Sequence, residues 1–220
     1  MIHVYYSIME KILKIGAIAS GSGSNFEAIV QATETGILKG KARVEVLICN
    51  KPEKYCIVRA KNHGIPAVLI ESDKHEGSRE EFDQKMIDVL DEHECELVVL
   101  VGYMRLVSQM FIDHFKGNVM NIHPALLPSF PGMHAHEDTL EHGVKVSGVT
   151  VHFVDPKEDH GPIIIQHAVP VYDTDTKDTL GPRILEWEHK AFPKAIELFH
   201  DKKLSIDGRI VRINGDVNLK

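Results

Sequence analysis

An amide and an imidazole lie two residues apart at the end of an apolar run, at Asn121 and His123, directly before Pro124. Alternate side chains of a β-strand point to the same face, so an extended chain would place these two groups side by side. Pro124 disfavours the helical conformation for the residue before it and so keeps His123 extended. Because α/β proteins usually do their chemistry at the carboxyl ends of buried strands, we predict a functional site here.

An acidic turn at residues 155–161 supplies a partner for this pair. If the turn folds back over the carboxyl edge of the sheet, Asp159 would pair with His123 and favour the protonated imidazole. A protonated imidazole beside an amide offers two donors to a developing oxyanion. No Ser or Cys occupies a nucleophile-elbow motif, which favours direct transfer between two bound substrates over a covalent intermediate. A buried Asn and a structural His at the end of a strand would fit the same residues equally well.

A second candidate site is the loop of small residues Ala-Ser-Gly-Ser-Gly-Ser-Asn at positions 19–25. Its backbone N–H groups can approach an anion closely, and the N-terminus of the helix that follows adds partial positive charge. The loop lacks the Lys of a Walker A motif, and Phe26 replaces the third glycine of the dinucleotide fingerprint. These features predict a site for a single phosphate. The alternative is an ordinary turn in which Ser24 or Asn25 caps the helix.

Histidines and arginines supply further candidates. The histidines gather between residues 123 and 160, but no HExxH motif or other familiar ligand spacing is present, so we predict no metal. The arginines could anchor substrate carboxylates, although exposed arginines are more often solvated. These residues are His123, His134, His136, His152 and His160, and Arg79 and Arg105.

The candidate site residues must be positioned by strands and helices, and the sequence shows short apolar runs that alternate with helical patterns. The alternation is typical of βαβ units around a parallel sheet, whose strands are rich in Val, Ile and Leu because both faces are covered. We predict strands at 12–19, 44–49, 67–70, 97–101 and 119–122, and helices at 26–35, 53–62, 78–93 and 109–115. Next we predict a Pro-rich loop at 123–135, a short helix at 136–142, two longer strands at 144–154 and 163–171, and a closing helix at 176–200 with Thr174 or Thr176 as its N-cap. The predicted fold is therefore α/β, a single domain with a Rossmann-like, mostly parallel sheet, helices on both faces and a late antiparallel portion.

The composition is that of an ordinary globular protein. The chain has 220 residues, of which 43% are hydrophobic and 26% charged, and its formal net charge of −7 argues against nucleic acid or anionic membranes as partners. Cys49, Cys56 and Cys95 show no CxxC pair and no zinc spacing, which favours reduced thiols. No stretch is apolar for long enough to be a signal peptide or a membrane span, so we predict a cytoplasmic protein.

Taken together, the motifs resemble those of a known enzyme family. They are Gly-Ser-Gly-Ser-Asn at 21–25, Gly-Tyr-Met-Arg at 102–105, Asn-Ile-His-Pro-Ala-Leu-Leu-Pro at 121–128, Phe-Pro-Gly at 130–132 and Asp-x-Gly-Pro at 159–162. In order and spacing they are similar to phosphoribosylglycinamide formyltransferase, an enzyme of purine synthesis. The resemblance implies formyl transfer from 10-formyltetrahydrofolate, a reduced folate co-substrate, to the amino group of glycinamide ribonucleotide. It implies a formyltransferase domain at residues 12–200, with an N-terminal extension at 1–11 and a C-terminal tail at 201–220; a monomer and a homodimer both stay open.

By position, the resemblance implies three groups of site residues. Asn121, His123 and Asp159 match the catalytic trio, in which Asp159 keeps His123 charged and helps to relay a proton through water to the departing folate nitrogen. The residues expected to bind glycinamide ribonucleotide, with the loop on its phosphate and Glu188 on its ribose, are Gly23, Ser24, Asn25, Gly102, Met104, Pro124 and Glu188. The residues expected to bind the folate, with Arg79 at its glutamate tail, are Arg79, Arg105, Leu106, Val107, Val154, Asp155 and Pro156.

Two residues depart from the family pattern. His160 stands where a small residue is often found and could alter the turn that holds Asp159. Leu185 stands where some relatives have a polar residue that assists the substrate.

Three other functions compete with this interpretation. Formyltetrahydrofolate hydrolase shares the Asn-x-His-Pro segment, but it lacks the loop at 21–25 and carries a regulatory domain that the eleven residues before the first strand cannot form. Methionyl-tRNA formyltransferase has a carboxyl-terminal RNA-binding domain, which suits an acidic chain poorly. A non-catalytic nucleotide-binding module on the same scaffold would be distinguished by substitution of Asn121 or His123.

Overall fold

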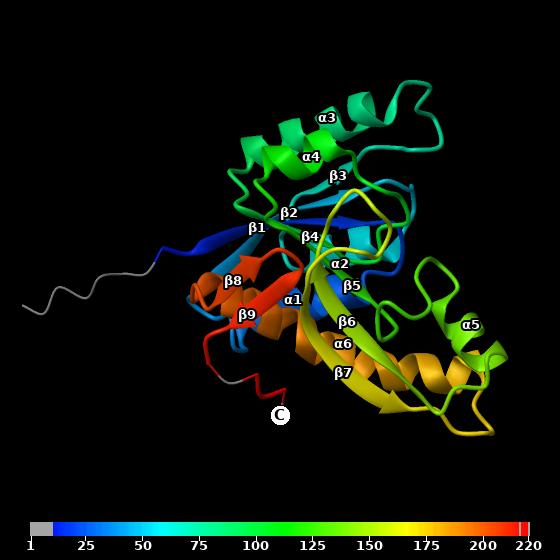
Figure 1. The fold of residues 1–220 in the computed structure, drawn as a ribbon. Coiled ribbons are helices and arrows are strands. Elements are labelled where there is room, and N and C mark those ends of the chain that lie inside the picture. The colour runs from blue at the N-terminus through cyan, green and yellow to red at the C-terminus, as the bar shows by residue number, and fades with distance from the viewer. Residues whose placement is uncertain (1–10, 216, 220) are drawn as a thin grey trace, which may run out of the picture.

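The computed structural model describes residues 11–215 and 217–219 (Figure 1). Except for Lys11, the N-terminal extension assigned to residues 1–11 lies outside the described residues. The strands are β1 (Leu13–Ala19), β2 (Ala42–Cys49), β3 (Ala67–Leu69), β4 (Leu97–Leu100), β5 (Val119–His123), β6 (Val146–Phe153), β7 (Ile163–Pro170), β8 (Leu204–Asp207) and β9 (Ile210–Ile213). The helices are α1 (Ser24–Glu34), α2 (Tyr55–Asn62), α3 (Arg79–Glu92), α4 (Gln109–His114), α5 (Ala135–Glu141) and α6 (Lys177–His200). Every predicted element is present, with ends that differ by at most two residues.

The strands of the described chain form one nine-stranded sheet in the order β3-β2-β1-β4-β5-β6-β7-β9-β8. From β3 to β5 neighbouring strands are parallel, whereas β6 runs antiparallel to both β5 and β7. The predicted α/β fold with a late antiparallel portion is confirmed.

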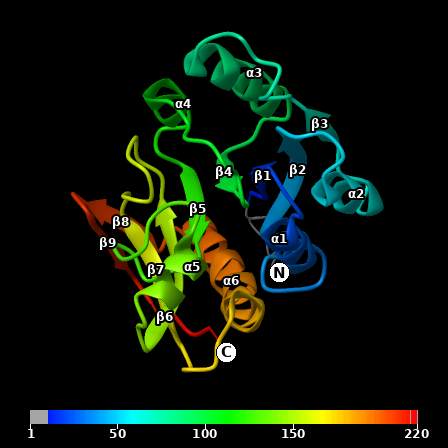
Figure 2. The same ribbon diagram turned by 90° about the vertical axis from the view of Figure 1, so that its right-hand side faces the viewer.

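Helices cover both faces of the sheet, as Figures 1 and 2 show. On one face α3 and α4 pack against the strands through the fully buried Phe82 and Phe111. On the other face α1, α2 and α6 pack together, with Phe26 and Phe192 fully buried. Within the described residues, each helix is too short or too polar to cross a membrane.

The strand order changes direction beside β1, because the chain runs outward through β2 and β3 and then returns to β4 on the other side of β1. Loops that leave the sheet at such a point diverge, and ligands of α/β proteins usually bind between them. Here the two loops are also tied together: Ser20 N–H donates to the Gly102 carbonyl at 3.0 Å, and Met104 N–H donates to Ser20 Oγ at 2.9 Å.

The caps of two helices test the sequence analysis directly. Thr176 is the N-cap of α6, as predicted. The alternative in which Ser24 or Asn25 caps α1 is wrong, because the helix begins at Ser24 and its N-cap is Gly23, with φ 73°. A glycine cap has no side chain to occupy the first N–H groups of the helix, so they stay accessible to an anion.

The C-terminal tail contains two strands that the sequence analysis did not assign. β8 and β9 form an antiparallel hairpin around Gly208 and Arg209, and Ile210 of β9 pairs in parallel with Ile163 of β7. Both strands have only four residues, and most of their side chains are exposed, so the hydrophobic signal is weak. The available signal was the Asp-Gly pair at 207–208 between alternating apolar residues, which is typical of a hairpin.

Candidate active site

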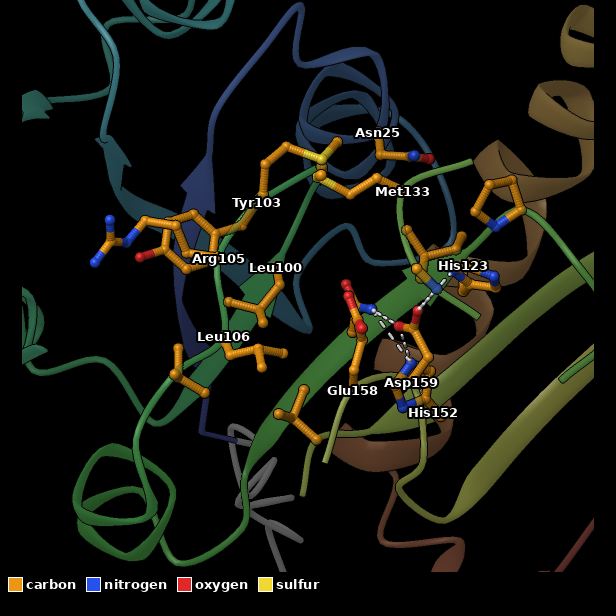
Figure 3. Close-up of a pocket in the computed structure, with 18 of the residues that line it drawn as sticks. Asn25, Leu100, Tyr103, Arg105, Leu106, His123, Met133, His152, Glu158 and Asp159 are labelled. Atoms are coloured by element: carbon orange, nitrogen blue, oxygen red, sulfur yellow. Dashed lines mark hydrogen bonds and ion pairs between the residues drawn. The ribbon is translucent and has the colours of Figure 1, made fainter. Parts of the chain in front are cut away.

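A cavity of about 470 Å³ opens at the carboxyl ends of β4 and β5, beside the start of α1 (Figure 3). Arg105 and Leu106 lie along one side of it, and His123, His152 and Asp159 lie together on the other. Most of the residues selected from the sequence line this cavity: Asn25, Gly102, Met104, Arg105, Leu106, Val107, Asn121, His123, Pro124, Val154, Asp155, Asp159 and Glu188.

The turn between β6 and β7 does fold back over the sheet and brings Asp159 to the end of β5. One carboxylate oxygen of Asp159, Oδ2, lies 3.2 Å from Nδ1 of His123 and accepts the N–H of Gly132 at 2.7 Å. The other, Oδ1, accepts a hydrogen bond from Nδ2 of Asn121 at 3.3 Å. Asp159 therefore contacts both other side chains of the expected catalytic trio.

The ring of His123 lies between two acceptors. Nε2 lies 2.6 Å from the carbonyl oxygen of Phe130, while Nδ1 faces the Asp159 carboxylate. Both partners are acceptors, and the ring can donate to both only when each nitrogen carries a hydrogen. Since His123 is buried, the carboxylate also supplies the countercharge that a buried imidazolium requires.

His152 orients the amide of Asn121. The two residues are paired in the antiparallel register of β5 and β6, and Asn121 Nδ2 lies 3.2 Å from His152 Nε2. Burial lowers the pKa of His152, so its ring is neutral at pH 7, and Nδ1 donates to the Phe153 carbonyl at 2.8 Å. Nε2 is then the acceptor, which means that the NH₂ group of Asn121, and not its oxygen, must face His152 and Asp159.

Gly23 is packed too tightly for a side chain. An added Cβ would lie 2.6 Å from Cβ of Cys56, and a φ of 73° is strained for any residue with a side chain. Nearby, Arg59 Nε donates to the Ser22 carbonyl at 3.1 Å, and Cys56 N–H donates to the Gly21 carbonyl at 3.3 Å. Residues of α2 therefore bind the carbonyl groups of this loop, and the backbone N–H groups at the start of α1 stay free to bind a ligand.

The side chain of Asn25 binds a buried acid instead of capping its helix. Asn25 Nδ2 donates to Glu188 Oε2 at 2.8 Å, which joins the start of α1 to the middle of α6. Burial raises the pKa of Glu188, and the hydrogen bond from Asn25 offsets only part of that effect. A buried carboxylate beside a cavity is suited to accept hydrogen bonds from ligand hydroxyl groups.

A family model described as formyl transferase matches residues 13–196 of the chain. Phosphoribosylglycinamide formyltransferase of Escherichia coli (strain K12) is 36% identical over 203 residues, which are 92% of this chain and 94% of the bacterial protein. The chain belongs to the phosphoribosylglycinamide formyltransferase family. The resemblance inferred from the sequence motifs is confirmed.

Further family members support the assignment. The crystal structure of glycinamide ribonucleotide transformylase 1 from Symbiobacterium toebii matches with a TM-score of 0.88 and 44% identity, over 92% of this chain and 94% of that one. The trifunctional purine biosynthetic protein adenosine-3 of Gallus gallus is 42% identical over 196 residues, or 89% of this chain. This chain spans only 19% of that longer protein.

Four residues selected through the family resemblance are not among the described residues that line the cavity: Gly23, Ser24, Arg79 and Pro156. Gly23 and Ser24 directly precede Asn25, which does line it. Arg79 begins α3 and Pro156 follows Asp155, and both are exposed. Their predicted contacts with substrate and folate stay predictions.

Three contacts of the trio were not found from the sequence: the His152 ring, the Phe130 carbonyl and the Gly132 N–H. The role of His152 depends on which residue faces Asn121 across the strand pair, and a sequence does not reveal that register. The other two are backbone groups, which any residue type carries. In the described chain, no group of three or more His, Cys, Asp or Glu side chains is arranged to hold a metal ion.

Proposed function

We propose that this chain transfers a formyl group from 10-formyltetrahydrofolate to the amino group of glycinamide ribonucleotide. The observation that carries the proposal is the single cavity shared by the trio, by Asn25 and Glu188, and by residues 102–107. Its volume of about 470 Å³ lies within the range of about 300–1,000 Å³ common for small-molecule sites. Membership of the formyltransferase family supports the same reaction.

The trio has the chemistry that formyl transfer to an amine requires. The amine nitrogen bonds to the formyl carbon, the bond from that carbon to the folate nitrogen breaks, and one proton moves from the amine to the folate nitrogen. Asn121 and the His123 imidazolium would donate to the oxyanion of the tetrahedral intermediate. Asp159 would hold His123 charged and accept the amine proton through water. These groups complete the step without a covalent enzyme intermediate or a metal.

Both donors are directed at protein acceptors in the structure. The amide hydrogens of Asn121 face His152 and Asp159, and the ring hydrogens of His123 face Asp159 and the Phe130 carbonyl. Donation to the formyl oxygen therefore requires that this oxygen replace one of those acceptors. Replacing Phe130 would keep the pair of His123 with Asp159 intact.

The two sides of the cavity suit the two substrates. Asn25 and Glu188 lie next to the glycine-capped start of α1, which would bind the phosphate and ribose of glycinamide ribonucleotide. Leu106, Val107 and Val154 line the cavity with an apolar surface suited to the flat pterin ring, and Arg105 supplies a cation. His123 and Asp159 lie on the wall opposite Arg105 and Leu106.

An absorbance assay of folate release, with and without glycinamide ribonucleotide, tests this function. We expect release only when the amine substrate is present, because the cavity is built for transfer between two bound molecules. Release at a similar rate without the amine would identify a formyltetrahydrofolate hydrolase instead. No release under either condition would contradict both activities.

A further inference from the structure

The C-terminal hairpin reaches the turn that carries Asp159. Figures 1 and 2 show β8 and β9 beside the start of β7, directly after this turn. Arg209, at the tip of the hairpin, donates from Nη2 to the carbonyl oxygen of His160 at 2.7 Å. Its Nη1 lies 2.9 Å from both ring nitrogens of His160. Arg209 therefore contacts the residue that directly follows Asp159.

The ring of His160 extends this contact across the turn. Nδ1 of His160 lies 2.6 Å from Oδ2 of Asp155, so the ring can donate to that carboxylate while the guanidinium group of Arg209 lies against both ring nitrogens. Asp155 and Asp159 both line the cavity. Through His160, the guanidinium group of Arg209 thus supports both ends of the segment from Asp155 to Asp159.

Asp159 needs such support because of its backbone. Its φ of 46° lies in the left-handed region, which residues other than glycine adopt rarely and keep only when their surroundings hold them. Its carboxylate must also meet donors from two different segments, β5 and the loop at residue 132. A shift of about 1 Å in a catalytic group can cost a large part of the rate.

We propose that Arg209 is a positioning residue that holds Asp159 in its working conformation through His160. The proposal rests on the catalytic role proposed above for Asp159. Arg209 lies beyond residue 196, where the match to the family model ends, so the family motifs do not assign it a role. It acts on the turn and not on a substrate, which means that its loss should lower the turnover number and leave binding of glycinamide ribonucleotide nearly unchanged.

The test compares Arg209→Met with Arg212→Met. Arg212 lies on the same hairpin and pairs with Asp207 at 3.3 Å, so its substitution removes an equal charge without touching the turn. We expect Arg209→Met to lower kcat about tenfold, as loss of a charge-assisted hydrogen bond implies, with the KM for glycinamide ribonucleotide changed less than twofold. Arg212→Met should stay within twofold of the unsubstituted chain, and Arg209→Lys should recover part of the loss because it can still donate to the carbonyl.

Amide hydrogen exchange gives a second readout that does not depend on activity. Exchange at residues 155–161 should be faster in Arg209→Met than in Arg212→Met, while the melting temperatures of the two variants stay similar. A kcat for Arg209→Met within twofold of the unsubstituted chain, or an equal loss in Arg212→Met, would overturn the proposal. If the unsubstituted chain transfers no formyl group, the proposed function fails, and the exchange comparison still decides whether Arg209 holds the turn.

Discussion

At the scale of single residues, hydrogen-bond partners decide the state of each group. His123 has an acceptor near each ring nitrogen, an arrangement that suits two donors, whereas burial lowers the pKa of His152 and Asn121 donates to it. Two histidines whose ring nitrogens lie 3.2 and 3.8 Å from the carboxylate of Asp159 therefore have different roles. One donates, and the other fixes the direction of an amide.

Glu188 is a site residue whose charged form lowers the stability of the fold. Its side chain is buried, and its hydrogen-bond partner is the neutral amide of Asn25 and not a cation. Because its folded-state pKa is raised above the usual 4.5, the folded protein binds this proton more tightly than the unfolded chain does. Stability is therefore lost as pH rises from about 4.5 through the raised pKa.

We predict that Glu188→Gln raises the melting temperature at pH 8 and weakens binding of glycinamide ribonucleotide. The amide cannot ionise, so it avoids the cost of a buried charge, but it is a poorer acceptor for the ribose hydroxyl groups. The gain should be near zero at pH 4 and grow to a few degrees at pH 8, since 1 kcal/mol corresponds to about 2–4 °C for a chain of this size. Thermal denaturation at both pH values and a binding titration measure the two effects.

Glu186→Gln is the control, because Glu186 is an exposed residue of the same helix that pairs with Lys190. It should show neither the pH-dependent gain nor the loss of binding. A Glu188→Gln variant that is less stable at pH 8, or whose gain does not change with pH, would contradict the assignment.

At the scale of elements, the strands were predictable because their sequences are strongly constrained. Buried parallel strands favour apolar residues, and β4 is an unbroken Leu-Val-Val-Leu run, while β1 and β5 are mostly apolar. The exposed four-residue strands β8 and β9 carry no such constraint. The first residue of α1 was not predictable either. Its N-cap is Gly23, which makes no side-chain hydrogen bond and is required because a side chain there would clash with Cys56.

The same packing predicts the effect of a side chain at Gly23. Gly23→Ala should push the loop away from α2 and move the N–H groups that would bind phosphate. We expect the Kd for glycinamide ribonucleotide to rise at least about tenfold and that for the folate less than threefold, since about 1.4 kcal/mol of lost phosphate contacts gives a factor of ten. Calorimetric titration with each ligand measures both values.

Gly40→Ala separates this effect from backbone strain. Gly40 has a similar φ of 77°, but an added Cβ there meets nothing within 4 Å. This control should lose some stability and keep both affinities. An equal loss of both ligands in Gly23→Ala would count against a phosphate site in this loop.

At the scale of the whole molecule, the sheet brings together groups that are far apart in the sequence. The motif at 121–124 was predicted to lie at a strand end, and Asp159 to meet it only if its turn folded back, because a sequence does not show how a turn packs. Contacts between distant segments, such as Arg209 with His160 or Asn25 with Glu188, follow from the topology alone. The family motifs identified the candidate site residues, and the structure shows which of them are in contact.

The convergence of β5 with the β6–β7 turn is the central claim, and Asp159→Asn tests it most directly. The substitution keeps the shape of the side chain and removes the carboxylate proposed to hold His123 protonated. The measurement is the single-turnover rate of formyl transfer with both substrates saturating and the melting curve as a control for folding. We predict a rate lower by about 10²–10³-fold in a folded protein. A rate close to that of the unsubstituted chain would contradict the account.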